Sequence, residues 1–391
     1  MSQKLITHST DLKKLRDDGF EIEIKNAYLL IHSVPYVNSE KEIARGTLVS
    51  NLTLAGDVTT RPDSHVMYFI GDHPCNNDGS VITGIRHQSQ TQTLAEGIVV
   101  NHSFSNKPPE GYKDYYEKVV NYVKIISAPA ESINPSVTAK TFKVVESENP
   151  NDVFNYLDTN SSRAEISTIS SKFDNLKIAI VGLGGTGSYI LDLIAKTQVK
   201  EIHLFDGDDF LQHNAFRAPG AASVEELNQK PKKVAYLEKI YSKMHKNIIS
   251  HDYYLTLSNV EELMGMDYVF ICIDSGETKK ILIGKLIENG VTFIDVGIGV
   301  QIIDNSLLGN LRVTSCVKEK NDYVDKRVSF ANEGNNDYSQ NIQIAELNAL
   351  NAALAVIKWK KMCHFYHDQE NEYNTIYGIS VNKLFNDEIV S

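Results

Sequence analysis

The chain has 391 residues, of which 42% are hydrophobic and 23% are charged, as expected for a globular protein with room for two domains. Its net charge of −11 argues against broad contact with a nucleic-acid backbone, which needs clustered Lys and Arg. Four cysteines without a Cys-x-x-Cys pair argue against structural zinc. The N-terminus lacks an apolar signal-peptide core and no apolar run could span a bilayer, so we expect a cytoplasmic protein that binds neither membrane nor nucleic acid.

The N-terminal part of the sequence mixes one short helix, several strands and a later amphipathic helix. Thr10 and Gly19 are start and stop signals for a helix over 11–18. We expect an α+β domain over residues 1–160, whose last part belongs to a polar linker over 146–171. Apolar patterning predicts strands over 20–25, 27–34, 47–55 and 65–70. In the later helix, four side chains share one face, namely Tyr115, Val119, Tyr122 and Ile126.

The segment from His73 to Ile82 resembles the His-Pro-Asn segment of ubiquitin-conjugating enzymes, where a glycine and an apolar pair lead to the catalytic cysteine. In this chain that cysteine would fall at Ile82 or Thr83, and no thiol stands there. The resemblance implies an inactive conjugating-enzyme-like fold that binds partners. A proline turn with an Asn-Asp-Gly hairpin signal explains the same residues, and Cys75 as an independent nucleophile is a third interpretation.

Strands and helices alternate after the linker, which is typical of a doubly wound α/β fold. The first apolar run is continuous rather than alternating, as expected for a strand that is covered on both faces. We expect a Rossmann-like, doubly wound α/β domain over residues 161–391. The predicted strands are 177–181, 201–205, 268–273, 292–296 and 310–314, and the predicted helices are 187–196, 233–244 and 343–361.

A glycine-rich loop joins the first of these strands to its helix. Side chains there would keep a phosphate from the backbone N–H groups at the start of the helix. The spacing fits a dinucleotide and ATP equally well, and Asp206, at the end of the next strand, suits the ribose of either ligand. The residues of the loop are Gly182, Leu183, Gly184, Gly185, Thr186 and Gly187.

The polar residues that follow separate these two ligands. Asp208, Asn214 and Arg217 follow the second strand, Lys233 starts a helix, and Asp274 follows a later strand. A dehydrogenase has no common use for this set. Attack of a carboxylate on the α-phosphate of ATP needs such a set. The reaction builds negative charge that fixed cations must stabilise, and a carboxylate must hold Mg²⁺.

This order of motifs resembles the ThiF/MoeB/ubiquitin-activating adenylyltransferases, which have a GxGGxG loop, Asp-x-Asp, Asn-x-x-Arg, a helix-starting Lys and a later Asp. The resemblance implies that the glycine loop cradles the phosphates of ATP. Lys232 is an alternative candidate for the helix-starting lysine of this pattern. The resemblance assigns the other residues as follows: Asp206, with Asp208 beside it, to the ribose, Asn214 and Arg217 to the triphosphate, Lys233 to the transferring phosphoryl group and Asp274 to Mg²⁺.

The same resemblance implies the partners. The substrate would be a ubiquitin-like protein with a C-terminal glycine, with a conjugating enzyme as a further partner. We expect a homodimer, because relatives pair these domains and the apolar helix over 343–359 needs a surface to cover. Some relatives pass the acyl group to a cysteine, and Cys316, between a strand and a polar segment over 322–341, is the best candidate. A buried strand cysteine is the alternative interpretation of Cys316.

Three other function classes stay open. A dinucleotide-dependent oxidoreductase would bind NAD at the glycine loop, which nucleotide titration tests. An adenylating tRNA-modifying cyclase of the same superfamily is disfavoured by the acidic net charge. A binding module with an inactive site is disfavoured because every expected core residue is present.

Overall fold

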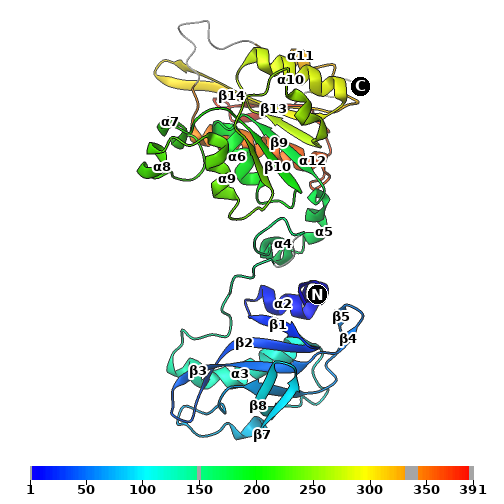
Figure 1. Ribbon diagram of the computed structural model, residues 1–391, viewed down its shortest axis with the longest axis vertical. Helices are drawn as coiled ribbons and strands as arrows, with labels where there is room; N and C mark the ends of the chain where they lie inside the picture. Colours follow the sequence, from blue (N-terminus) through cyan, green and yellow to red (C-terminus); the bar gives the residue numbers. More distant parts are fainter. Residues whose placement is uncertain (1, 148–150, 331–341, 387–391) are drawn as a thin grey trace. The chain divides into compact units, whose positions relative to one another are not determined.

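Two units make up the chain, Met1–Val145 and Glu146–Ser391, in a computed structural model that describes residues 2–147, 151–330 and 342–386 (Figure 1). The domain boundary near residue 160 stays a prediction, because the units meet upstream of it, inside the expected linker. Across the described residues, every helix is too short or too polar to cross a membrane.

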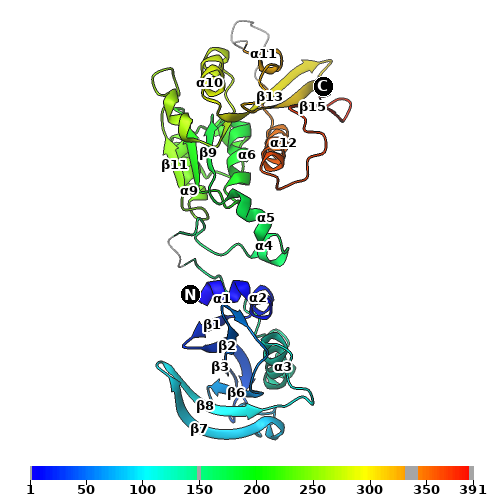
Figure 2. The same ribbon diagram turned by 90° about the vertical axis from the view of Figure 1, so that its right-hand side faces the viewer.

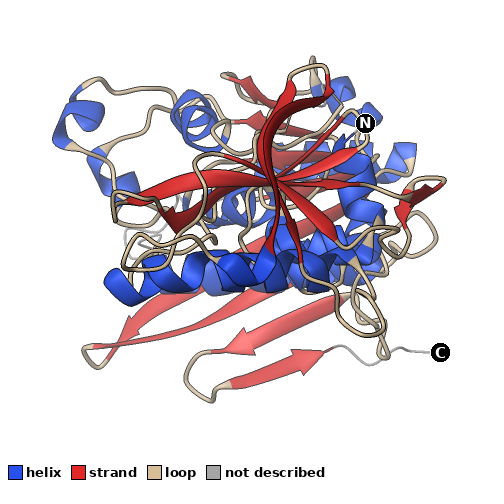
Figure 3. Cartoon of the chain, turned by 90° about the horizontal axis from the view of Figure 1, so that it is seen from below, coloured by secondary structure: helices blue, strands red, loops and turns tan. Residues whose placement is uncertain are grey.

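The first unit is a six-stranded antiparallel sheet with helices packed on one face, in a layer apart from the strands (Figures 2 and 3). The strand order is β1-β2-β3-β6-β8-β7, and a separate small hairpin is formed by β4 and β5. The elements are α1 (Ser2–His8), α2 (Thr10–Asp17), β1 (Ile22–Lys25), β2 (Tyr28–Val37), β3 (Ile43–Asn51), β4 (Leu54–Ala55), β5 (Val58–Thr59), β6 (Val66–Ile70), η1 (Thr83–Ile85), β7 (Arg86–Ala95), β8 (Ile98–Ser105) and α3 (Tyr115–Ile133).

The late helix α3 supplies most of the first core. The four side chains predicted to share one face, from Tyr115 to Ile126, are all fully buried against the sheet, which confirms that prediction. Asp114 caps the helix by accepting a hydrogen bond from the backbone N–H of Glu117. The early helix begins at Thr10 rather than after it, because Ser9 is the capping position.

The hairpin formed by β7 and β8 was not predicted from the sequence. Strand β7 reads Arg-His-Gln-Ser-Gln-Thr-Gln-Thr-Leu-Ala, and most of its side chains are exposed. An edge strand without a buried face lacks the apolar alternation that marks a strand in the sequence. Its presence extends the sheet beyond β6, because β8 pairs with both β6 and β7.

The second unit is an eight-stranded mixed sheet in the order β11-β10-β9-β12-β13-β14-β15-β16. The first five of these pair in parallel and the last three pair antiparallel. The strands are β9 (Lys177–Val181), β10 (Glu201–Phe205), β11 (Ile248–His251), β12 (Tyr268–Ile271), β13 (Thr292–Ile303), β14 (Ser306–Cys316), β15 (Asn374–Gly378) and β16 (Lys383–Asn386).

Helices cover both faces of this sheet, which confirms the Rossmann-like, doubly wound fold. Alternate residues of β9 belong to two different cores: Ile178 and Ile180 pack with α6, α9 and α12, whereas Ala179 and Val181 pack with α10 and η3. The helices are α4 (Thr159–Arg163), α5 (Ser167–Ser170), η2 (Ser171–Phe173), α6 (Gly185–Ile194), α7 (Gln212–Ala215), α8 (Val224–Asn228), α9 (Lys233–Tyr241), η3 (Val260–Gly265), α10 (Gly276–Asn289), α11 (Val324–Arg327) and α12 (Ala345–Met362).

Helix α12 buries its apolar face within its own unit. It packs on α6 and β13, and Trp359 is fully buried in a stack with Phe173, whose ring centroid lies 4.7 Å away. Leu350 and Ile357 of the same helix stay exposed. Packing within the unit therefore accounts for most of its apolar side chains, and the homodimer stays a prediction.

Candidate active site

The carboxyl ends of β9, β10 and β12 meet at one edge of the second sheet. The chain runs outward from β9 to β10 and β11, and then crosses back to β12 on the other side of β9. Ligands of open α/β sheets bind where the strand order reverses in this way. A hollow of 800 Å³ opens at this point and extends over β13, β14 and α12, a size that suits a nucleotide and a second substrate.

The glycine loop after β9 is shaped mainly by its own packing. Gly182 has a φ of +90°, and a Cβ there would lie 2.8 Å from the carbonyl oxygen of Cys272. A Cβ on Gly187 would lie 1.9 Å from the carbonyl oxygen of Gly182. A Cβ on Gly184 would meet nothing within 4 Å, and Gly184 lines the hollow. Of these three glycines, only Gly184 therefore matches the expected role of leaving room for a phosphate.

Asp206 braces this loop. Its Oδ2 accepts a hydrogen bond from the N–H of Leu183 at 2.7 Å, and its Oδ1 accepts one from the N–H of Asp208 at 2.9 Å. The side chain is almost fully buried. Asp206 therefore lines the hollow, where it was expected to bind the ribose. Both of its carboxylate oxygens also accept hydrogen bonds from the backbone of the neighbouring loops.

Asp208 and Lys233 form an ion pair in the hollow. The Lys233 ammonium lies 2.6 Å from Oδ2 of Asp208 and 3.5 Å from Oδ2 of Asp206. Burial would raise the pKa of Asp208, but hydrogen bonds from Lys233 and Tyr254 outweigh it and lower the pKa. The rival Lys232 points elsewhere, since it pairs with Asp209 at 3.0 Å. Lys233 lines the hollow and Lys232 does not, so the geometry favours Lys233 for the predicted role.

Arg217 and Asp274 also line the hollow. Burial lowers the pKa of Arg217, while the nearby charges of Asp274 and Asp208 act in the opposite direction. The Nε of Arg217 is buried without a hydrogen-bond acceptor among the described residues, so the guanidinium has a donor available for an anion. Asn214 is buried beside them, but its Oδ1 accepts from the N–H of Leu211 and it does not line the hollow.

Helix α12 contributes residues that sequence reasoning missed. Asn348 is fully buried, and its Oδ1 accepts a hydrogen bond from the hydroxyl of Thr186 at 2.9 Å. A Cβ on Gly185 would lie 2.0 Å from the Nδ2 of Asn348, so this glycine admits α12 rather than a phosphate. Lys279 of α10, Arg312 of β14 and Asn351 of α12 also line the hollow. In the sequence, these residues could have been recognised only as polar residues within otherwise apolar helix and strand patterns.

The structure places Cys316 away from this chemistry. Its thiol lies in the core between β14 and α11, it does not line the hollow, and burial raises its pKa to about 12. Cys272 lines the hollow, yet burial, with a contribution from Asp295, raises its pKa as well. The alternative interpretation of Cys316 as a buried strand cysteine matches this geometry. Much of the polar segment over 322–341 lies outside the described residues.

In the first unit, the His73 segment follows β6. Cys75 is buried, and burial followed by the charge of Asp78 raises its pKa, so no group there activates the thiol. Its backbone forms bridges to Val37 and Val81, as a turn that joins strands would. This placement favours the structural interpretations of the segment over a nucleophilic Cys75.

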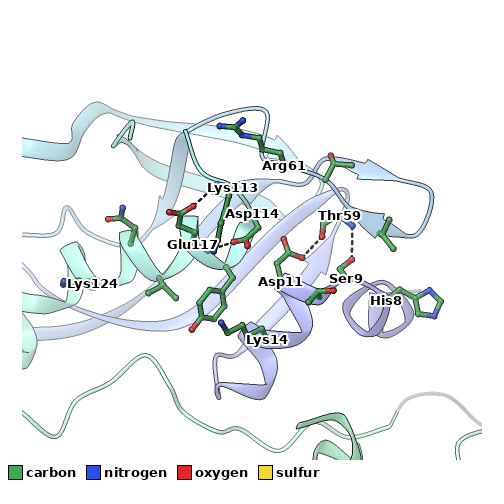
Figure 4. A pocket seen from close by; sticks show the side chains of 16 residues that line it. His8, Ser9, Asp11, Lys14, Thr59, Arg61, Lys113, Asp114, Glu117 and Lys124 are labelled. Carbon is green, nitrogen blue, oxygen red and sulfur yellow. Dashed lines mark hydrogen bonds between the residues drawn. The ribbon is translucent and has the colours of Figure 1, made fainter. Parts of the chain in front are cut away.

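The first unit has a hollow of similar size, 840 Å³, lined by α2, β5 and the start of α3 (Figure 4). Its carboxylates are engaged in local structure. Asp11 accepts hydrogen bonds from the hydroxyl of Thr59 and the N–H of Tyr115, and Asp114 caps α3. Lys14, Arg61, Lys113 and Lys124 also line this hollow, but no glycine is among its lining residues. The hollow of the second unit combines its cations with the glycine loop at the start of α6, so it is the candidate active site.

The residues of this hollow fit ATP and Mg²⁺. The open side of Gly184 and the N-terminus of α6 offer backbone N–H groups to phosphates, and the free Nε of Arg217 offers a side-chain donor. Mg²⁺ is commonly held by one or two carboxylates together with phosphate oxygens. Asp274 is placed for that, although the described residues contain no group of three or more metal-ligating side chains.

Comparison with known proteins adds two family matches. Residues 161–380 match the model of the ThiF family, and residues 10–159 match a domain of unknown function, DUF6791. A curated relative, tRNA threonylcarbamoyladenosine dehydratase of Haemophilus influenzae, is 29% identical over 123 residues, which are 31% of this chain and 46% of the relative. The chain thus spans about half the length of the curated relative that it matches.

Solved structures with a similar arrangement were also found. E. coli MccB with ATP has a TM-score of 0.47 at 14% identity, covering 59% of this chain and 72% of that one. E. coli tRNA N6-threonylcarbamoyladenosine dehydratase, TcdA, has a TM-score of 0.41 at 20% identity, covering 52% of this chain and 92% of that one.

Proposed function

The chain belongs to the ThiF family, and from this premise we propose that it uses ATP and Mg²⁺ to adenylate the C-terminal glycine carboxylate of a ubiquitin-like protein. The observation that carries the proposal is the convergence of Lys233, Arg217 and Asp274 on one hollow beside the glycine loop. These are the charges that phosphoryl transfer to a carboxylate requires, and a hydride-transferring enzyme has no use for them.

The reaction is a displacement at phosphorus. A carboxylate oxygen of the substrate forms a bond to the α-phosphorus of ATP, and the bond from that phosphorus to the oxygen bridging the β-phosphate breaks. The products are an acyl-adenylate and pyrophosphate, and no proton needs to move. Negative charge grows on the equatorial and leaving oxygens, so fixed cations that contact those oxygens lower the barrier.

The residues of the hollow divide this work. The N–H groups of the glycine loop hold phosphate oxygens, and Arg217 and Lys233 meet the charge on the transferring and leaving groups. Asp206 and Asp208 share Lys233, and the charges of Lys232 and Arg217 also interact with Asp208. Asp274, together with phosphate oxygens, would hold Mg²⁺, which would supply further positive charge at the phosphates.

The proposal is tested by Mg²⁺-dependent exchange of labelled pyrophosphate into ATP. Wild-type protein should catalyse the exchange when a glycine-ended ubiquitin-like protein is present. Asp274→Ala should lower the rate roughly 10²- to 10³-fold, the usual cost of removing one preorganised transition-state contact. Asp209→Ala is a matched control, because Asp209 lies outside the hollow and pairs with Lys232. Wild-type exchange in the Asp274 variant would refute the assignment.

A second candidate substrate is a small carboxylate attached to tRNA. The similarity to tRNA threonylcarbamoyladenosine dehydratase favours this candidate, because that relative acts on tRNA. The net charge of −11 argues against it. The same exchange assay decides between the two, since total tRNA in place of the ubiquitin-like protein should then support exchange, and ribonuclease should abolish it.

We further propose that the acyl group leaves the adenylate without a thioester on this chain. Burial raises the pKa of all four cysteines, Cys75, Cys272, Cys316 and Cys363, and a thiolate is the nucleophile that a thioester needs. On this view the first unit recruits a partner such as a conjugating enzyme. The homodimer and the cytoplasmic location stay predictions.

A further inference from the structure

A second hollow in the unit Glu146–Ser391 lies apart from the candidate active site, and we call it the aromatic hollow. Its volume is 410 Å³, at the small end of the range for small-molecule pockets. It is lined by residues just after α6 and by the C-terminal end of α12, whereas the candidate active site is lined by the N-terminal ends of the same two helices. None of the described residues lines both hollows, so the two are separate sites.

Aromatic side chains reach the wall of this hollow from three segments of the chain. Phe154 and Tyr156 come from the segment before α4, Phe173 from η2, and Phe365 from the residues after α12. The rings of Phe173 and Phe365 are stacked, with centroids 5.2 Å apart and planes inclined by 25°. A planar aromatic ligand suits such a wall, because stacked and edge-to-face arrangements of rings are favourable.

One cation in the aromatic hollow lacks an anionic partner. The ammonium of Lys360 lies 4.7 Å from the ring centroid of Phe365 and 5.6 Å from that of Phe173. Among the described residues it has neither an ion pair nor a hydrogen bond. Burial lowers the pKa of Lys360, while the nearby Cys363 acts in the opposite direction. An anion in this hollow would therefore meet a cation that is positioned by two rings and is not yet neutralised.

The other polar side chains of the wall are already engaged within the protein. Lys196 contacts both carboxylate oxygens of Asp192 at 2.7 Å. Asp158 caps α4 by accepting a hydrogen bond from the N–H of Ser161 at 2.9 Å, and the hydroxyl of Thr197 donates to a backbone carbonyl at 2.7 Å. A single cation is thus left for a ligand, which favours one carboxylate over a doubly charged phosphate.

We propose that the aromatic hollow binds a small aromatic carboxylate, with the carboxylate on the ammonium of Lys360 and the ring on the aromatic wall. One or two fused rings suit a volume of 410 Å³. Because the hollow is separate from the site of the proposed adenylation, this inference goes beyond the proposed function and does not depend on it.

A ligand in this hollow would also hold the segment 154–161 on the second unit. The chain before it is tied down by two backbone hydrogen bonds, from the N–H of Asn155 to the carbonyl oxygen of Met244 at 2.9 Å and from the N–H of Lys246 to that of Val153 at 2.7 Å. Beyond these bonds the side chain of Tyr156 is exposed, so a bound ring has an uncovered surface to pack on. Binding should therefore order the backbone that follows Tyr156.

The test is isothermal titration calorimetry of the full-length protein with 1-naphthoate and with its uncharged counterpart, 1-naphthamide. Wild-type protein should bind the acid roughly 10- to 100-fold more tightly, the range for a hydrogen bond between charged groups. In Lys360→Met, which keeps most of the aliphatic stem, both compounds should bind with the weak affinity of the amide. Lys196→Met is the matched control. It removes the other ammonium that lines the hollow, which is paired with Asp192, and should keep the wild-type preference for the acid.

Two further measurements separate recognition by Lys360 from a structural effect of its removal. The affinity for 1-naphthoate should fall as the pH rises from about 7 to about 10, because a neutral amine no longer attracts the carboxylate, while the affinity for the amide stays constant. Hydrogen exchange within residues 154–161 should slow when 1-naphthoate is added to wild-type protein and stay unchanged when it is added to Lys360→Met.

Three outcomes of the titrations would overturn the inference: no binding of either compound to wild-type protein, equal binding of acid and amide to it, or a preference for the acid that survives in Lys360→Met. Displacement of 1-naphthoate by a non-hydrolysable ATP analogue would overturn it as well, because the compound would then occupy the candidate active site. Residual binding of the amide to Lys360→Met shows that the hollow of this variant is intact.

Discussion

The two units of the chain bury charged side chains in different ways. In the second unit, Lys233 and Lys279 are buried against carboxylates, and both pairs face one hollow. In the first unit, buried Lys118 donates to the hydroxyl of Ser50 and to the carbonyl oxygen of Ser64, which are neutral groups. Opposed charges that converge on a cavity can act on a ligand, and Lys118 lines neither of the two large hollows. The comparison favours the second unit as the place of the proposed chemistry.

The largest expected effect comes from the glycine loop on which the second unit's site depends. Gly187→Ala should abolish ATP binding and destabilise the unit, because the added Cβ would lie 1.9 Å from the carbonyl oxygen of Gly182. Gly184→Ala should fold normally and weaken ATP binding only, because its Cβ meets no protein atom. Calorimetric titration with ATP and thermal unfolding measure both. If Gly187→Ala bound ATP like the wild type, the loop would not be the nucleotide site.

A smaller effect is expected on the stability of the first unit, whose free energy of unfolding should depend on pH through Lys118. Burial lowers the pKa of Lys118 to about 8 from its usual 10.5. Between these values the unfolded chain binds the extra proton, so the folded unit gains stability as the pH rises from 8 towards 10. The full shift is worth roughly 3 kcal/mol. Lys118→Met should lose this gain. Urea unfolding at several pH values, followed by the methyl NMR signals of Val119 and Ile126, measures it, and identical pH slopes in both proteins would contradict it.

The smallest effect is expected at Cys75. Cys75→Ser should leave pyrophosphate exchange unchanged, because burial and Asp78 raise the pKa of this thiol and nothing nearby lowers it. The check is a non-reducing gel after incubation with ATP and a ubiquitin-like protein. A reducible adduct that persists in Cys316→Ser and disappears in Cys75→Ser would make the first unit catalytic and remove the contrast between the units.

Sequence reasoning worked where one short stretch of chain carries both the structure and the chemistry. Strands 177–181 and 201–205 were predicted with their observed bounds. The first is a continuous apolar run after Lys177, as expected for a strand that is covered on both faces, and the second alternates polar and apolar residues before Phe205. The glycine loop, Lys233 and Asp274 were proposed as site residues because each follows a strand or starts a helix. All of them line one hollow in the structure, and their roles stay predictions.

It failed where the site is assembled from distant segments. Arg312 faces Gly297 through strand pairing, and Asn348 contacts Gly185 through helix packing. The sequence around each residue does not indicate its distant partner, so these contacts could not be predicted. Strand β13 was predicted to end at residue 296 and continues to Ile303, because glycines at 297 and 299 interrupt the apolar pattern. Gly297 and Gly299 also line the hollow, so the residues that hid the end of the strand from prediction belong to the candidate site.

The stacking of Trp359 on Phe173 has a practical consequence. Trp359 is the only tryptophan in the sequence, and it is fully buried in the core of the second unit, between α12 and the segment that leads into β9. Phe173 lies between Trp359 and Phe365, because its ring stacks on both. Intrinsic tryptophan emission from the intact chain therefore reports on the second unit alone, so the unfolding of this unit can be followed optically without cutting the chain and without tryptophan emission from the DUF6791 unit.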